Sequence, residues 1–279
     1  MKLKVDFHTH STASDGRKSP SELVEAAKLN NVHIMALTDH DTLKGIDEAI
    51  SEGLKLGVKV IPGIELSSLH NGESVHILGY FKGDGYHNED LINFLKDKED
   101  ARLKRAEKFI ENLNICFNIK IDYNEVLSIS NGLVARPHIA KAIIDAGYDY
   151  SWNYIFDKFL SDSSPAYVPN KKVSISEAIT LLHKHGALAV LAHPILLKKN
   201  SSHDLMRIFD FDGLEAFYYL NSKQKEADFI TLAHNYNKLV TCGSDYHGID
   251  GDGKHGIIGS VKFTEDYLNK FLEALKIGC

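Results

Sequence analysis

Short apolar runs alternate with helical patterns along most of the chain. Strands are expected at 2–7, 33–37, 58–64, 74–80, 187–192, 213–217 and 239–242, and helices among them at 20–30, 45–56, 176–185 and 222–235. The strands are predicted from apolar runs bounded by turn residues, and the helices from apolar residues three and four positions apart. Seven strands that alternate with helices favour a parallel βα architecture of the α/β class, and we expect a closed or nearly closed barrel.

Local signals mark the ends of two of these helices. Ser19 is a suitable N-cap, and Pro20 suits a first turn because that turn leaves its N–H groups unpaired in any case. Gly57 follows the second helix, and glycine readily takes the left-handed conformation at which many helices end. These signals support the alternation of strands and helices.

The middle of the chain has a different pattern. A long charged helical pattern covers 88–113, and the segments after it have helical spacing without a convincing strand. We therefore predict a discontinuous barrel domain, formed by 1–82 and 173–279, and a helical insertion at 83–172 that caps the active site.

Composition and charge narrow the class of protein. Of 279 residues, 43% are hydrophobic and 25% charged, which argues against disorder, collagen and coiled coil. The net charge of −6 disfavours a basic surface that binds long nucleic acid. The sequence has no run of 18 apolar residues, so no membrane span is predicted. Three scattered cysteines, Cys116, Cys242 and Cys279, favour a reducing compartment, so a cytoplasmic protein is expected.

Histidine is the unusual residue, with 15 copies. His8 and His10 end the first predicted strand, and side chains two positions apart on a strand point to the same side, as two ligands of one first-row metal ion must. The other strand ends carry similar groups, namely Asp39, His40, Asp41, Glu65, His76, His193, Glu215, Asp245 and His247. Because the carboxyl ends of strands converge on one face of a βα barrel, we predict a multinuclear metal site there.

The motifs DFHTHS, SDG, LTDHDT, GIELS, LAHP and GSDYHG occur in this order. Together they resemble the PHP superfamily, named for polymerase and histidinol phosphatase, over roughly residues 1–82 and 174–262. The resemblance implies a distorted (β/α)7 barrel that holds three divalent metal ions (Mn, Zn, Fe or Mg) and hydrolyses phosphoesters.

The resemblance also implies the ligands of each ion. The first ion would take His8, His10, Glu65 and Asp245; the second would share Glu65 and add His76 and His193; the third would take Asp15, His40 and His247. The implied nucleophile is a metal-bridging hydroxide held by Glu65, Asp245 and His193. Asp39 and Asp41 are candidates to orient ligands, or else caps of the loop around His40.

Four residues are candidates for substrate binding. Arg17 and Lys44 lie within a few residues of implied ligands and would either reach a phosphate or point into solvent. Arg136 and His138 lie in ARPHIA, which is similar to a motif of the subgroup that dephosphorylates nucleoside 3′,5′-bisphosphates and trims short RNA from its 5′ end. Arg136 would clamp a phosphate or else pair with an acidic neighbour.

Three alternatives remain open beside the hydrolysis of small phosphorylated nucleotides. Small phosphorylated nucleotides and short RNA ends are the expected substrates, and histidinol phosphate is an alternative one. A metal-stabilised accessory module without catalysis and a metal-dependent hydrolase of C–N bonds are the other two readings.

Overall fold

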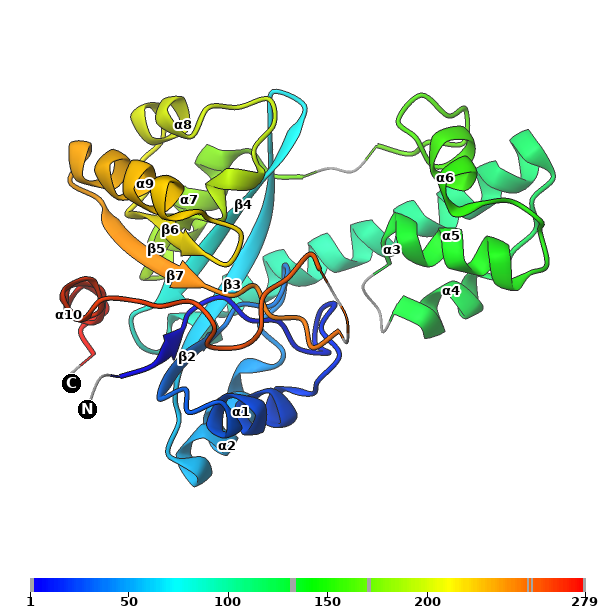
Figure 1. The fold of residues 1–279 in the computed structure, drawn as a ribbon. Helices are drawn as coiled ribbons and strands as arrows, with labels where there is room; N and C mark the ends of the chain where they lie inside the picture. Colours follow the sequence, from blue (N-terminus) through cyan, green and yellow to red (C-terminus); the bar gives the residue numbers. More distant parts are fainter. Residues whose placement is uncertain (1–2, 131–133, 170–171, 250, 252, 278–279) are drawn as a thin grey trace. The chain divides into compact units, whose positions relative to one another are not determined.

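The computed structural model describes residues 3–130, 134–169, 172–249, 251 and 253–277 (Figure 1). Its strands form one seven-stranded sheet within these residues, and neighbours in the sheet follow the order of the chain: β1 (Val5–Asp6), β2 (Ile34–Leu37), β3 (Lys59–His70), β4 (Glu73–Phe81), β5 (Ala187–Leu191), β6 (Gly213–Tyr218) and β7 (Leu239–Gly243). The first strand is shorter than the expected 2–7, and Lys2 lies outside the described residues.

The sheet curls until its two edges approach each other. The Phe7 N–H, directly after β1, donates to the Cys242 carbonyl in β7 at 3.2 Å. Farther along, Thr9 and Tyr246 form an isolated parallel bridge. The expectation of a nearly closed seven-stranded α/β barrel is therefore confirmed.

One strand runs against the expected parallel direction. β4 is antiparallel to both β3 and β5, whereas the alternation of strands and helices favoured a parallel architecture. The reason is local: Asn71 and Gly72 join β3 to β4 with φ of 48° and 71°. A two-residue Asn-Gly turn with both φ values positive matches the twist of a hairpin, and leaves no room for a crossover helix.

The helices of the barrel unit begin and end at the expected signals. In α1 (Pro20–Leu29), the Ser19 hydroxyl accepts a hydrogen bond from the Glu22 N–H, and the Glu22 carboxylate accepts one from the Ser19 N–H. α2 (Ile46–Leu56) ends at Gly57, whose φ is 68°. The remaining helices of the unit are η1 (Asp84–His87), α7 (Ile175–Lys184), η3 (Pro194–Leu196), α8 (Ser202–Ile208), α9 (Lys223–Asn235) and α10 (Glu265–Ala274).

The chain divides into two compact units, one of residues 1–92 with 172–279 and one of residues 93–171. The second unit has its own apolar core, centred on buried side chains that include Phe109, Leu113 and Ile143. Its described elements are α4 (Tyr123–Ser130), α5 (Arg136–Asp145), α6 (Trp152–Tyr154), η2 (Ile155–Phe159) and most of α3 (Glu89–Phe117). The predicted capping of the active site by this segment stays a prediction.

Two of the three cysteines fall within the described residues. Cys116 is exposed and Cys242 is buried, and both are free thiols; Cys279 lies outside those residues. Within the described part of the chain, no helix has both the length and the apolar character needed to cross a bilayer.

Candidate metal centre

Histidine and carboxylate side chains from six of the strands, or from the loops that follow them, meet at one end of the barrel. Among the described residues, three groups have ligand atoms that all lie within 4.8 Å of one another. The groups are His8, His10, Glu65 and Asp245; His10, Asp15, His40 and His247; and His40, Glu65 and His76. Eight of the nine implied ligands fall into these groups, and the ninth, His193, lies beside them with Nε2 3.0 Å from Glu65 Oε1.

Glu65 lies at the centre of these contacts and is 1% exposed. Its Oε1 is 2.7 Å from His76 Nδ1 and 3.0 Å from His193 Nε2. Its Oε2 is 3.1 Å from His8 Nε2 and 3.1 Å from His10 Nε2. The two oxygens therefore face different sets of imidazoles, and Glu65 is shared by two of the three groups.

Asp245 completes the first group from the loop after β7. Its Oδ1 is 3.3 Å from His8 Nε2 and 3.1 Å from His10 Nε2. The Tyr218 hydroxyl donates to the other oxygen at 3.0 Å and fixes the carboxylate plane. Four ligand atoms, two nitrogens and two oxygens, thus converge on one point, and first-row metal ions accept such mixed sets.

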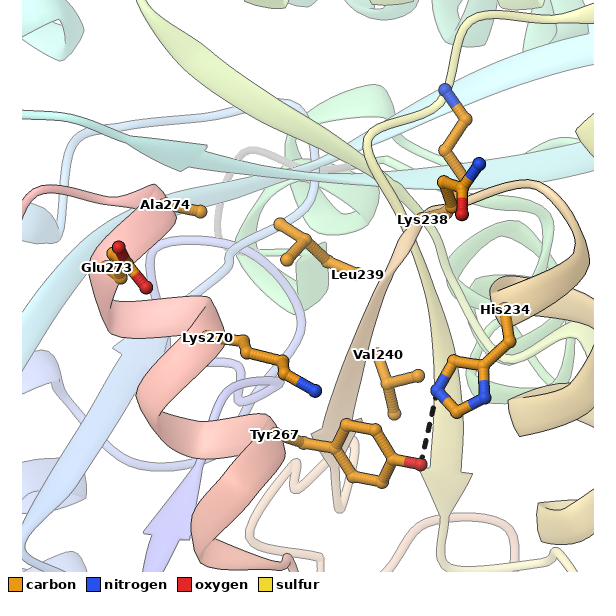
Figure 2. Close-up of a pocket in the computed structure, with 9 residues that line it drawn as sticks. His234, Lys238, Leu239, Val240, Tyr267, Lys270, Glu273 and Ala274 are labelled. Carbon is orange, nitrogen blue, oxygen red and sulfur yellow. Dashed lines mark hydrogen bonds between the residues drawn. The ribbon is translucent and has the colours of Figure 1, made fainter.

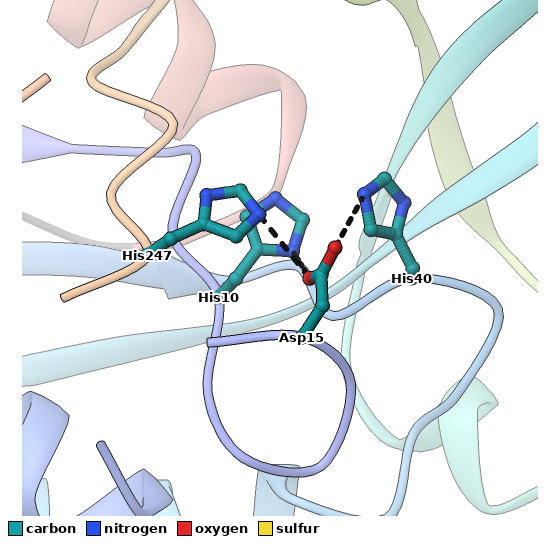
Figure 3. A group of neighbouring side chains, drawn as sticks. All are labelled: His10, Asp15, His40 and His247. Carbon is teal, nitrogen blue, oxygen red and sulfur yellow. Dashed lines mark ion pairs between the residues drawn. The ribbon is translucent and has the colours of Figure 1, made fainter. Parts of the chain in front are cut away.

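The group around Asp15 is drawn in Figure 3. Asp15 Oδ1 lies 3.2 Å from His247 Nε2, and Asp15 Oδ2 lies 3.7 Å from His40 Nε2. His10 Nδ1 is 3.7 Å from the same carboxylate. His10 therefore offers one ring nitrogen to each of two groups, which the implied ligand sets did not contain.

Unpaired nitrogen atoms show that the site fits cations. Both ring nitrogens of His10, and Nδ1 of His40, are buried without a hydrogen-bond partner among the described residues. His10 Nε2 is close to two carboxylate oxygens but not aligned with either as a donor. A buried polar atom without a partner is costly, and a metal ion held by these imidazoles and carboxylates would remove that cost.

The electrostatics of the site also favour bound cations. Burial alone would lower the pKa of His8, but Asp245, Glu215 and Glu65 outweigh it and raise that pKa well above its usual value. Burial is likewise outweighed at His10, where the same pair of carboxylates that faces His8 raises the pKa to about 10. The imidazoles in turn lower the pKa of Glu65 against its burial. The site is therefore rich in negative charge when no metal ion is bound.

Glu215 ends a predicted strand but is not among the ligands that the resemblance implies, and the structure gives it a clear place. It is fully buried on β6, with Oε1 3.1 Å from His8 Nδ1. Its Oε2 accepts a 2.7 Å hydrogen bond from the His193 N–H. A carboxylate on Nδ1 places the ring proton there and leaves Nε2 of His8 free to bind a cation.

Two further carboxylates shape the loops that carry the implied ligands. Asp39 Oδ1 accepts from the Ser11 N–H at 2.7 Å and from the Ser14 hydroxyl at 2.6 Å, so it holds the loop that presents Asp15. Asp6 accepts from the backbone N–H groups of Ser244 and Gly259. The orienting role left open for Asp39 fits its geometry, whereas Asp6 was not singled out from the sequence.

Strained backbone supports several of these side chains. Asp41, His193 and Asp245 have φ of 52°, 24° and 56°, values that L-residues seldom adopt. A Cβ on Gly243 would overlap both the His8 Cβ and Glu215 Oε1. Such strain concentrates at functional sites because the surrounding contacts enforce it.

The four substrate candidates lie in different settings. The Arg17 N–H donates to the His247 carbonyl at 2.8 Å, which ties Arg17 to the loop of the Asp15 group, and Lys44 is exposed on the loop after His40. In the second unit, Arg136 Nη1 pairs with Asp162 Oδ1 at 2.9 Å. His138 Nδ1 accepts from the N–H of Ala135 at 3.1 Å. The pairing of Arg136 with an acidic neighbour is the alternative that the sequence left open, and the substrate-binding roles of all four stay predictions.

A comparison of the sequence with known protein families identifies the family of this chain. The family described as "PHP domain" matches residues 6–277. The chain belongs to the PHP domain family. The matched range takes in all the motifs of this PHP chain, from DFHTHS to GSDYHG.

Two relatives of the PHP chain are named for action on RNA or on a nucleotide. A 5′-3′ exoribonuclease of Haemophilus influenzae is 31% identical over 252 residues, which are 88% of this chain and 91% of that protein. A 3′,5′-nucleoside bisphosphate phosphatase of Chromobacterium violaceum is 27% identical over 272 residues, 94% and 92% of the two chains. A solved structure described as an amidohydrolase of C. violaceum, with bound sulfate and no metal, has a TM-score of 0.80 and 25% identity, and the match covers 98% of this chain and 97% of that one.

Proposed function

We propose that this PHP-family phosphoesterase hydrolyses small phosphorylated nucleotides, namely nucleoside 3′,5′-bisphosphates and the 5′ ends of short oligoribonucleotides. The observation that carries the proposal is the sharing of Glu65, His10 and His40 between ligand groups. Shared ligands hold neighbouring cations a few ångströms apart, as metal-dependent phosphoryl transfer needs. The proposal assigns the ions to the nine residues brought together at the carboxyl end of the barrel, with His193 next to Glu65.

Divalent ions held by these histidines and carboxylates would supply two things: polarisation of a phosphoryl oxygen, and a lower pKa for water near neutral pH. The chain's own residues supply orientation. Glu215 fixes the ring of His8, Asp39 fixes the loop of Asp15, and Tyr218 fixes Asp245. Geometry held by buried hydrogen bonds needs little rearrangement during the reaction, and this is a main source of catalytic power.

Arg17 is the cation best placed to hold a substrate phosphate. Its backbone is bonded to the loop of His247, and its guanidinium makes no ion pair within the described part of the chain. A free guanidinium beside the site binds a phosphate through two parallel hydrogen bonds. The acidic overall charge of −6 fits a short substrate better than a long nucleic acid.

The substrate is tested by product release from the Mn²⁺-loaded protein. Adenosine 3′,5′-bisphosphate, a 5′-phosphorylated RNA tetramer and histidinol phosphate are supplied separately, and phosphate and mononucleotides are quantified. We expect turnover of the first two, and a loss of at least about 100-fold in Asp245→Asn with the fold retained. Faster turnover of histidinol phosphate contradicts the proposed substrate class.

A hydrolase of C–N bonds is the second candidate, because one similar structure is described as an amidohydrolase. Release of ammonia from amides or amidines, with no phosphate released from any phosphoester, would favour this candidate. A protein that binds metal and folds but hydrolyses neither class would favour a non-catalytic module.

A further inference from the structure

A pocket of about 490 Å³ adjoins the metal centre within the barrel unit. Its lining includes Tyr218, Tyr219, Asn221, His255, Ser260 and Lys262. These residues come from two segments, the end of β6 with the turn that follows it and the stretch between β7 and α10. Its volume lies in the range of pockets that hold small molecules.

Two contacts join this pocket to the ligand groups. The Tyr218 hydroxyl, in the pocket wall, donates to Asp245 Oδ2 at 3.0 Å. The ring of His255, also in the wall, stacks on His247 with centroids 3.9 Å apart. A substrate whose phosphate reaches Asp245 and His247 therefore meets the pocket next.

Close backbone packing fixes the second segment against the metal centre. The Gly256 N–H donates to the Ser244 carbonyl at 2.8 Å. A Cβ on Gly256 would lie 2.7 Å from that carbonyl oxygen and 2.8 Å from the Tyr219 Cβ. The pocket wall is thus held in place by the same loop that carries Asp245.

The polar groups of the pocket are not all used within the protein. Lys223 pairs with Glu226 at 2.6 Å. Lys262, by contrast, is exposed and forms no ion pair with any residue that the structure describes. Asn221 Oδ1 is buried without a hydrogen-bond partner among these residues. An unpaired cation and an unpaired acceptor remain beside two tyrosine rings, and together they suit an organic group with hydrogen-bond donors and a negative charge.

We propose that this pocket binds the leaving group of the substrate, and that Lys262 selects phosphomonoesters whose leaving group carries a second phosphate. This inference rests on the proposed function and adds the residue that distinguishes a nucleoside bisphosphate from a simple phosphomonoester. Lys262 acts on binding, not on bond cleavage, because it reaches the phosphate that stays on the nucleoside.

A second pocket provides a control, because it lies at the other end of β7 (Figure 2). It is lined by Leu239 and Val240, at the start of the strand, whereas Asp245 follows its end. Its cation Lys270 is paired with Asp266 at 2.8 Å. Lys270→Ala therefore removes a lysine of the same unit without touching the metal centre.

The test compares wild type, Lys262→Ala, Lys262→Arg and Lys270→Ala, all loaded with Mn²⁺. KM and kcat are measured for adenosine 3′,5′-bisphosphate and for p-nitrophenyl phosphate, which lacks a second phosphate. We expect Lys262→Ala to raise KM about tenfold for the bisphosphate only, with kcat changed less than about twofold, because one charge-assisted hydrogen bond is lost. Lys262→Arg should recover most of the affinity, and Lys270→Ala should match wild type.

A binding measurement separates this inference from the proposed function. Calorimetry measures the affinity of a 3′-methylenephosphonate analogue of the bisphosphate, in which a CH₂ group replaces the ester oxygen and prevents hydrolysis. About tenfold weaker binding to Lys262→Ala supports the pocket whether or not wild type releases phosphate. Equal binding to wild type and Lys262→Ala, or an equal rise of KM for both substrates, overturns the inference. Absence of phosphate release from wild type would instead overturn the proposed function.

Discussion

Replacement of Glu215 by glutamine tests whether a buried carboxylate outside the ligand groups sets the affinity for metal. Glu215 is fully buried, accepts from the His193 N–H at 2.7 Å and lies 3.1 Å from His8 Nδ1. In Glu215→Gln the carbonyl oxygen can still accept from the His193 N–H. The amide NH₂ then faces His8 Nδ1 and moves the ring proton to Nε2, the nitrogen that faces Glu65 and Asp245.

The size of the effect follows from this change of tautomer. In the variant, His8 must take up its less favourable tautomer before Nε2 can bind a cation, which costs free energy. No solvent screens the contact between His8 and residue 215, because both side chains are fully buried. Loss of a partner that orients a ligand typically weakens metal binding about 10- to 100-fold, or about 1.4 to 2.7 kcal/mol. The side chain keeps its volume, so we expect the metal-free protein to lose less than about 2 kcal/mol of unfolding free energy.

The assay is a Mn²⁺ titration followed by electron paramagnetic resonance, together with phosphate release at saturating metal. Asp212→Asn is the matched control, because Asp212 Oδ2 also faces a histidine, His183 Nε2 at 2.7 Å, and accepts from a backbone N–H, that of Ala189 at 2.8 Å. Asp212 precedes β6 and lies away from the ligand groups. Mn²⁺ affinity and turnover equal to wild type in Glu215→Gln would refute the orientation of His8 by Glu215.

Three further changes test other supports of the site and the fold. Asp39→Asn should weaken the binding of one Mn²⁺ roughly tenfold in the same titration, because the loop of Asp15 loses an acceptor; unchanged stoichiometry and affinity would contradict this. Gly243→Ala should lower the unfolding free energy in urea by about 1–3 kcal/mol, because its Cβ overlaps His8, and wild-type stability would show that the strand end can shift. Burial lowers the pKa of His185, so its neutral form is favoured in the folded state. Its contribution to stability is therefore complete above the unfolded pKa of about 6.5 and declines as the pH falls through the folded pKa. The unfolding free energy of His185→Gln should fall less than that of wild type between pH 7.5 and 5. An equal fall in the two proteins would exclude His185 as the cause.

Much of the site could be predicted because its ligands follow strand ends. The spacing of His8 and His10 places both side chains on one side of a strand, whatever the rest of the fold does. The carboxyl ends of strands then gather ligands as distant in sequence as His8 and Asp245, without any need to know each contact. Prediction from sequence succeeds here because periodicity and topology together determine where the side chains lie.

The supporting carboxylates were harder to predict for a physical reason. Glu215 lies 207 residues from His8, on a strand whose six residues are all buried. Nothing in its neighbours distinguishes a carboxylate that accepts two hydrogen bonds from one that binds a cation. The same holds for Asp6, whose partners Ser244 and Gly259 come from the far end of the chain.

The direction of β4 shows a different kind of error. Alternating strands and helices favoured parallel pairing, but no helix separates β3 from β4. The dipeptide Asn71-Gly72 is a strong local signal for a hairpin between them. The two-residue turn fixes the register, so that Ser67 pairs with His76 and Glu65 pairs with Leu78.

That hairpin is also what brings His76 to the metal centre. A strand that left β3 through a crossover helix would return parallel to it, and its own carboxyl end would face the site. Because β4 runs backwards, the residue near its beginning faces the site instead, and His76 Nδ1 reaches Glu65 Oε1 at 2.7 Å. The departure from a regular βα barrel therefore has a chemical consequence: it lets Glu65 meet His76 on one oxygen while the ends of β1 and β2 meet the other oxygen through His8, His10 and His40.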